Sequence, residues 1–161
     1  MAGTEKFGPS AAIDNLYENQ IVVLCDIEEN LKLHRQRAIE LFTQIGMKIV
    51  YMEANDHDRH AAFISHLPHA ISFALANTVM RQEDPKSIVA LAVGGFKDMS
   101  RIAKSSPKMW SDIFKQNNKN LLESIEYFQK ELKLAKKLIK KKKWDELEDW
   151  MRKATTLHNI L

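Results

Sequence analysis

Four histidines crowd one stretch of the chain, at His57, His60, His66 and His69. Histidine binds metal ions and handles protons near neutral pH, so a shared metal site is the first chemistry to consider. In a helix each residue turns by about 100°, which puts His66 opposite His57 and His69 opposite His60. At most a pair could share one ion, and no H-E-x-x-H pattern is present, so we expect no metal.

Two of these histidines, His66 and His69, bracket Pro68 within an apolar helical segment. An interior proline removes one backbone hydrogen bond and bends a helix, at about 3 kcal/mol, and strained positions cluster at functional sites. We therefore predict that His66 and His69 line a polar pocket near a bend. The alternative is that both are ordinary core histidines. For His57 and His60 the prediction is a surface or capping position.

A second group of residues with chemical potential is Gly94-Gly95-Phe96-Lys97-Asp98-Met99-Ser100-Arg101. Paired glycines allow a ligand to approach the backbone closely, and an arginine can hold a carboxylate through two parallel hydrogen bonds. Asp98 lies three residues before Arg101 and could orient it if the stretch is helical. The alternative is a helix boundary with an ordinary surface salt bridge.

Composition excludes several classes of protein. The net charge of +3 is too small to indicate nucleic acid, and the lysine-rich segment 136–143 is followed at once by acidic residues, which is typical of a solvated surface. No apolar run approaches the roughly 20 residues that span a bilayer, so we expect no membrane association. Cys25 is the single cysteine and no secretory signal pattern is present, which favours the cytoplasm.

The elements that must position these residues change in type near residue 55. Residues 21–24 are β-branched and predict a strand, residues 30–45 predict a helix with Asn30 as its cap and Gly46 as its stop, and residues 48–52 predict a second strand. This order is typical of the end of an α/β domain. We therefore predict a short α/β remnant over residues 1–55.

Helical patterns dominate the rest of the chain, which predicts a mainly α fold with a helical domain over residues 56–161. The expected helices are Asp56–Arg81, a segment with an unbroken apolar period from Pro107 to Lys143, and Trp144–Leu161. Ser106 and Pro107 predict a capped helix start. Large apolar faces in so short a chain suggest a dimer, which would cover them.

Four motifs together resemble the prephenate dehydrogenase family: Ser65-His66-Leu67-Pro68-His69, Gly94 to Arg101, Pro107 to Phe114 with Trp110, and Met1-Ala2-Gly3-Thr4-Glu5-Lys6. The resemblance implies a Rossmann domain that binds NAD or NADP, followed by a helical dimerisation domain. It also implies oxidative decarboxylation of prephenate to 4-hydroxyphenylpyruvate in tyrosine biosynthesis, with a homodimer as the assembly and no metal.

The resemblance also implies roles for individual residues. Arg101 matches the arginine that grips a substrate carboxylate, and His69 matches the histidine of the substrate pocket. Ser65, Thr4, Gly94 and Gly95 match pocket-lining positions, and Trp110 matches an aromatic residue that approaches the neighbouring subunit's pocket. Glu5 and Asp98 match acidic residues that gate or order the site, and we expect His66 to support it.

The family's catalytic histidine falls two residues before Met1, and this chain has no G-x-G-x-x-G fingerprint after a strand, so no catalytic residue is expected within it. We therefore expect the chain to be the substrate-binding and dimerisation part of the enzyme, inactive in hydride transfer by itself. One alternative is the same part of an arogenate dehydrogenase. A second, from another class, is a non-catalytic helical module that dimerises or binds a small acid.

Overall fold

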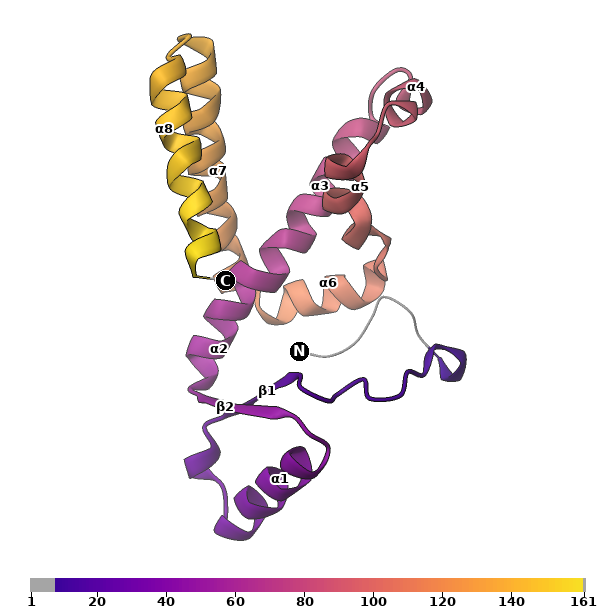
Figure 1. Cartoon of the computed structure of the whole chain (residues 1–161), viewed down its shortest axis with the longest axis vertical. Helices are drawn as coiled ribbons and strands as arrows, with labels where there is room; N and C mark the ends of the chain where they lie inside the picture. Colours follow the sequence, from indigo (N-terminus) through magenta and orange to yellow (C-terminus); the bar gives the residue numbers. More distant parts are fainter. Residues whose placement is uncertain (1–7, 161) are drawn as a thin grey trace. The chain divides into compact units, whose positions relative to one another are not determined.

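The computed structural model describes residues 8–160, which fall into two compact units, Met1–Leu121 and Leu122–Leu161. The first unit opens with a short turn, η1 (Pro9–Ala11), and then folds as strand, helix and strand (Figure 1): β1 (Ile21–Cys25), α1 (Lys32–Gln44) and β2 (Lys48–Met52). The two strands are parallel, with Ile21 opposite Lys48 and Cys25 opposite Met52. The predicted strand-helix-strand order is confirmed.

The two ends of α1 differ from each other in how well the sequence predicted them. Gly46 follows the helix with φ of 76°, the left-handed conformation that glycine adopts most easily, so the predicted stop is confirmed. The predicted cap at Asn30 is wrong, because Leu31 occupies the cap position and makes no side-chain cap bond. The amide of Asn30 instead donates to the carbonyl of Asp26, 3.4 Å away across the turn η2 (Ile27–Glu29).

A long helical segment follows the sheet and carries the histidines. It consists of α2 (Ala54–Ala61), a π-helical turn η3 (Ala62–His66) and α3 (Leu67–Met80), which form one continuous ribbon in Figure 1. In the π turn, the N–H of Leu67 donates to the carbonyl of Ala62, five residues earlier. The interruption expected at Pro68 therefore takes the form of a π turn, a feature that often occurs at functional sites.

Three short elements pack against α3 or lie next to it in the chain: α4 (Pro85–Ala90), α5 (Gly94–Ser100) and the 3-10 turn η4 (Arg101–Lys104). They lead to α6 (Pro107–Gln116). The predicted cap at Ser106 is confirmed, because its hydroxyl accepts a hydrogen bond from the N–H of Met109 at 3.4 Å. Asp84 caps α4 in the same way, through the N–H of Ser87 at 3.1 Å.

The apolar period from Pro107 to Lys143 predicted a continuous helix, but the helix is interrupted at Asn117, where φ is −113° and ψ is 36°. α7 (Asn118–Lys140) begins after this break and continues into the second unit. There it forms a hairpin with α8 (Trp144–Thr155), and the turn η5 (Thr156–Asn159) follows. The indole N–H of Trp150 donates to the carboxylate of Glu131 at 2.7 Å and joins the two helices.

The fold class predicted from the sequence, a mainly helical chain preceded by two short strands and a helix, is confirmed. The compact units divide at residue 121, and the domain boundary expected near residue 55 stays a prediction. Across residues 8–160, each helix is either too short or too polar to cross a bilayer.

Candidate functional site

The centre of the candidate site is the indole of Trp110, which is only 7% exposed and projects from α6. The ring of His69, from α3, stacks on it with a centroid separation of 3.5 Å and an interplanar angle of 21°. His66 meets the same indole edge-on at 6.1 Å, and Phe114 lies at 5.6 Å. Three residues that the sequence singled out separately, His66, His69 and Trp110, are therefore brought together.

The π turn fixes the orientation of His69. Its Nδ1 lies 2.9 Å from the carbonyl oxygen of Ser65, four residues earlier. A carbonyl only accepts, so Nδ1 carries the proton and donates this bond. The neutral ring is then left with a lone pair on Nε2, and that atom has no hydrogen-bond partner within residues 8–160. Ser65 thus contributes through its backbone.

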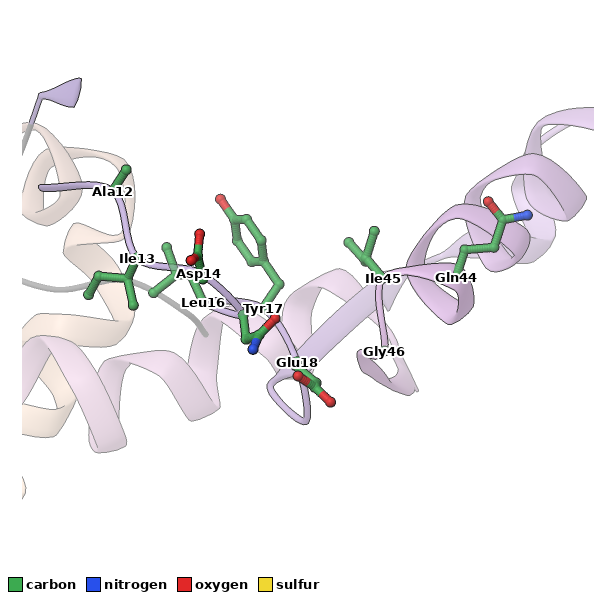
Figure 2. Close-up of a pocket in the computed structure, with 10 residues that line it drawn as sticks. Ala12, Ile13, Asp14, Leu16, Tyr17, Glu18, Gln44, Ile45 and Gly46 are labelled. Carbon is green, nitrogen blue, oxygen red and sulfur yellow. The ribbon is translucent and has the colours of Figure 1, made fainter. Parts of the chain in front are cut away.

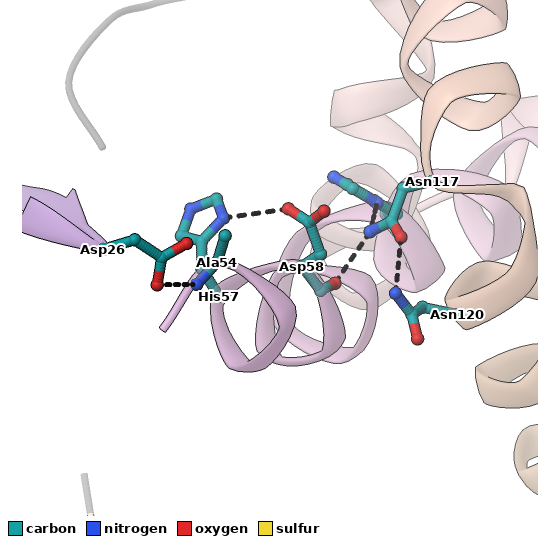
Figure 3. A network of polar contacts seen from close by, with 7 residues as sticks. Asp26, Ala54, His57, Asp58, Asn117 and Asn120 are labelled. Carbon is teal, nitrogen blue, oxygen red and sulfur yellow. Dashed lines mark hydrogen bonds and ion pairs between the residues drawn. The ribbon is translucent and has the colours of Figure 1, made fainter. Parts of the chain in front are cut away.

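His66 is held by a different partner, the side chain of Asn117 at the break between α6 and α7. The amide Nδ2 of Asn117 lies 3.2 Å from Nδ1 of His66 and 2.7 Å from the carbonyl oxygen of Asp58, on α2 (Figure 3). Burial lowers the pKa of His66, Asp58 opposes this by raising it, and His57 and His69 lower it further. His66 is therefore biased toward its neutral form.

An apolar hollow of about 270 Å³ lies beside the indole, lined by Phe73, Pro107, Trp110, Ser111 and Phe114. The indole N–H of Trp110 is itself buried and has no acceptor in the described part of the chain. Aromatic rings around a small hollow favour an apolar or aromatic ligand group. His66 and His69 contact Trp110, one of the residues that line the hollow.

The arginine and glycines of the second motif lie on elements next to α3. Arg101 begins η4, and both η4 and α5 pack against α3, the helix that carries His69. The guanidinium is exposed and makes no ion pair with Asp98 or any other residue between 8 and 160. Gly94 and Gly95 are exposed at the start of α5, where an added Cβ would meet nothing within 4 Å.

Two of the predicted site residues, Thr4 and Glu5, lie outside the residues that the structure describes. Trp110, which the resemblance placed near the neighbouring subunit's pocket, stacks on His69 of its own chain. His57, expected at the surface, is partly exposed and lies 3.1 Å from the carboxylate of Asp58. The roles assigned to these residues stay predictions.

Sequence reasoning missed Asn117, although a signal was present. Asn117 lies three residues after Phe114 and four before Leu121, on the apolar stripe of the predicted helix. A polar side chain on such a stripe is buried and needs hydrogen-bond partners. Asn117 is 9% exposed and has them, because its Oδ1 also accepts from Nδ2 of Asn120 at 2.7 Å.

The turn after β1 does not fit the pyrophosphate of a dinucleotide. A pyrophosphate needs a glycine-rich turn after the first strand, with free backbone N–H groups and no negative charge. The turn after β1 instead carries Asp26, Glu28 and Glu29, and contains no glycine. The carboxylate of Asp26 accepts a hydrogen bond from the N–H of Ala54 at 3.0 Å and so holds the start of α2 (Figure 3).

Two further findings bear on ligands. Between residues 8 and 160, no three His, Cys, Asp or Glu side chains cluster closely enough to hold a metal ion. A larger, open hollow of about 720 Å³ lies between residues 12–18 and the end of α1, as Figure 2 shows. None of the predicted site residues lines it.

Comparison with known proteins agrees with the fold. Residues 53–153 match the family profile described as prephenate dehydrogenase, dimerization domain, and residues 1–51 match that of the prephenate dehydrogenase nucleotide-binding domain. The first match covers more than half of the chain. The chain therefore belongs to the prephenate dehydrogenase family, and the resemblance inferred from its motifs is confirmed.

Comparison with individual relatives gives the same family. The chain is 35% identical over 147 residues to a prephenate dehydrogenase of Lactococcus lactis, a match that covers 88% of this chain and 38% of the relative. Prephenate dehydrogenase from Aquifex aeolicus, solved with hydroxyphenyl propionate and NAD+, is 36% identical with a TM-score of 0.90, over 98% of this chain and 56% of that one.

Arogenate dehydrogenase from Synechocystis is 28% identical to the chain, with a TM-score of 0.83, over 98% of this chain and 58% of that one. The chain thus spans between about two fifths and three fifths of the length of these relatives.

Proposed function

We propose that this chain is the substrate-binding and dimer-forming part of an NAD-dependent prephenate dehydrogenase of tyrosine biosynthesis. The activity would be the oxidative decarboxylation of prephenate to 4-hydroxyphenylpyruvate in the cytoplasm. The observation that carries the proposal is the meeting of His66 and His69 on the buried indole of Trp110, beside an aromatic hollow. Membership of the family supports it.

The chemistry of the cluster suits a small cyclic acid. Prephenate has a ring with a hydroxyl group and two carboxylates, so its site needs an apolar wall, a hydrogen-bond acceptor and a cation. The aromatic side chains of α3 and α6 supply the wall, and the unprotonated Nε2 of His69 supplies the acceptor. Arg101 supplies an exposed guanidinium that can hold a carboxylate through two hydrogen bonds.

The nucleotide is proposed to bind elsewhere in the enzyme, because the acidic turn after β1 does not fit a pyrophosphate. NAD, or NADP, would supply the acceptor for the hydride when bound. We expect the isolated chain to show no dehydrogenase activity with prephenate and NAD. Turnover close to that of an intact relative would contradict this.

Dimerisation is proposed because the described residues bury few large side chains. The buried hydrophobic residues are Ala61, Ala62, Trp110, Leu121 and Leu138, while Leu91 and Val93 are 83% and 75% exposed. Apolar surface of this kind is stabilised when a second copy covers it. Sedimentation over a range of concentrations should show a monomer–dimer equilibrium or a stable dimer, and a monomer at every concentration would refute it.

Ligand binding tests the proposed site directly. Calorimetric titration with prephenate or 4-hydroxyphenylpyruvate should show binding that Arg101→Ala weakens by about 2 kcal/mol or more, roughly 30-fold. Arg81→Ala is the matched control, because Arg81 is an exposed arginine at the end of α3, outside the site. Equal affinities for the wild type and Arg101→Ala would refute the assignment of Arg101 as the residue that holds a ligand carboxylate.

The same titration separates the alternatives. The similarity to the Synechocystis arogenate dehydrogenase makes arogenate the second candidate ligand. Arogenate carries an amino group where prephenate carries a keto group, so tighter binding of arogenate would shift the proposal to that substrate. A chain that dimerises but binds neither acid would be a non-catalytic interaction module.

A further inference from the structure

The side-chain amide of Asn117 makes hydrogen bonds through both its nitrogen and its oxygen, and its nitrogen bonds to residues far earlier in the sequence. Its Nδ2 donates to the carbonyl of Asp58 at 2.7 Å and to Nδ1 of His66 at 3.2 Å, and its Oδ1 accepts from Asn120 at 2.7 Å. These contacts decide which end of the amide is nitrogen. The carbonyl of Asp58 only accepts, so the atom that faces it must be a donor.

The orientation of this amide determines the protonation of His66. Because Nδ2 of Asn117 only donates, Nδ1 of His66 must accept with a lone pair, and the proton of the neutral ring must lie on Nε2. His69 has the opposite arrangement, since its Nδ1 donates to the carbonyl of Ser65. Two neighbouring histidines on the same indole thus hold opposite tautomers.

We propose that Asn117 is a positioning residue that holds His66 as the neutral tautomer with its proton on Nε2. The site then presents a hydrogen-bond donor from His66 next to an acceptor from His69. Ligands that combine an acceptor oxygen with a hydroxyl group fit this pair. The identity of the ligand rests on the proposed function, whereas the tautomer of His66 does not.

The charged groups around His66 agree with this assignment. Asp58 and His57 on α2, and His69 on α3, are the titratable groups that act on it among residues 8–160. Asp58 favours protonation, but burial and the two histidines oppose it, and the pKa of His66 is lowered. A neutral His66 adds no positive charge to the site.

Nitrogen-15 NMR of the imidazole rings tests the proposal in the chain as it exists, without a ligand. In the wild type, Nδ1 of His66 should have the shift of an unprotonated ring nitrogen and Nε2 that of a protonated one. Asn117→Asp puts a carboxylate beside Nδ1, so the proton should move to Nδ1 and the pKa of His66 should rise.

The matched control is Asn118→Asp, which makes the same change in charge one residue further along. Asn118 is exposed and its amide donates to the carbonyl of Lys115, so this variant should leave the His66 signals unchanged. The wild-type spectrum is decisive even if Asn117→Asp fails to fold. A proton on Nδ1 of His66 in the wild type, or a titration that Asn117→Asp leaves unaltered, would overturn the proposal.

Ligand titration then separates this inference from the proposed function. The probe is 4-hydroxyphenylpyruvate, which carries both an acceptor oxygen and a hydroxyl group, titrated at one pH into the wild type and into Asn117→Asp. If the tautomers are as proposed but the probe does not bind, the substrate assignment fails and the role of Asn117 stands. If the probe binds but His66 carries its proton on Nδ1, the proposed role of Asn117 fails and the substrate assignment stands.

Discussion

Replacing Trp110 by alanine should destabilise the first unit by about 4 kcal/mol. The side chain is 93% buried, and truncating a buried tryptophan typically costs about 3–5 kcal/mol. The variant also loses the stacked contact with His69 at 3.5 Å and the contact with Phe114 at 5.6 Å, and aromatic pairs contribute roughly 0.5–1.5 kcal/mol each.

Phenylalanine at the same position separates packing from hydrogen bonding. The indole N–H of Trp110 has no acceptor among the described residues, so Trp110→Phe removes no bond within residues 8–160 and keeps an aromatic ring against His69. We expect a loss of under about 1.5 kcal/mol for this variant. The difference between the two variants measures the contribution of the ring.

Urea denaturation followed by circular dichroism provides the measurement, with the slope of the transition compared between variants. Trp144→Ala is the control, because Trp144 is 57% exposed and lies in the second unit, so the transition of the first unit should not move. A loss of under 1 kcal/mol for Trp110→Ala, or equal losses for the alanine and phenylalanine variants, would refute the packing argument.

Three further outcomes follow from single residues. The pKa of His66 is lower in the folded chain than in the unfolded chain, so the unfolded state binds more protons at acidic pH. The free energy of unfolding should therefore fall as the pH drops below about 6.5, which denaturation curves at several pH values would measure. Gly46→Ala should lower the free energy of unfolding by at least about 1 kcal/mol in the same assay, because φ is 76° and the new Cβ would lie 3.3 Å from Cγ of Glu18. Gly95→Ala should have a smaller effect, because its new Cβ would meet nothing within 4 Å. Ser106→Ala should lower the free energy of unfolding by about 1 kcal/mol, because the N–H of Met109 loses its capping hydrogen bond at the start of α6. Ser111→Ala is the control, since Ser111 lies within α6 and is not its cap residue.

Local sequence patterns predicted those elements that depend on interactions between residues close together in the sequence. The β-branched residues of β1 and β2, the glycine after α1 and the Ser106-Pro107 helix start act over a few residues, and all four appear where the sequence placed them. The cap at Asn30 failed because a competing acceptor, the carbonyl of Asp26, lies within reach of its amide. A short polar side chain near a turn commonly has two such choices.

Contacts between distant segments could not be predicted in the same way. The spacing of His66 and His69 around Pro68 marked a candidate site, but nothing in that spacing shows that Trp110, about forty residues later, contacts both of their rings. The break at Asn117 was hidden for the same reason. Its apolar neighbours keep a helical period, and its need for partners is met by Asp58 and His66, from another part of the chain.

The position of the histidines depends on polar contacts at both ends of α2. At its beginning, the carboxylate of Asp26, which follows β1, accepts from the N–H of Ala54. Near its end, the carbonyl of Asp58 accepts from Asn117. Both contacts cross long stretches of sequence, and both have directional geometry, which apolar packing lacks. Because the buried hydrophobic side chains of α2 and the π turn are only alanines, these two contacts help to fix where His66 lies, together with its contact with Trp110. A residue at either contact therefore acts on the site without touching a ligand.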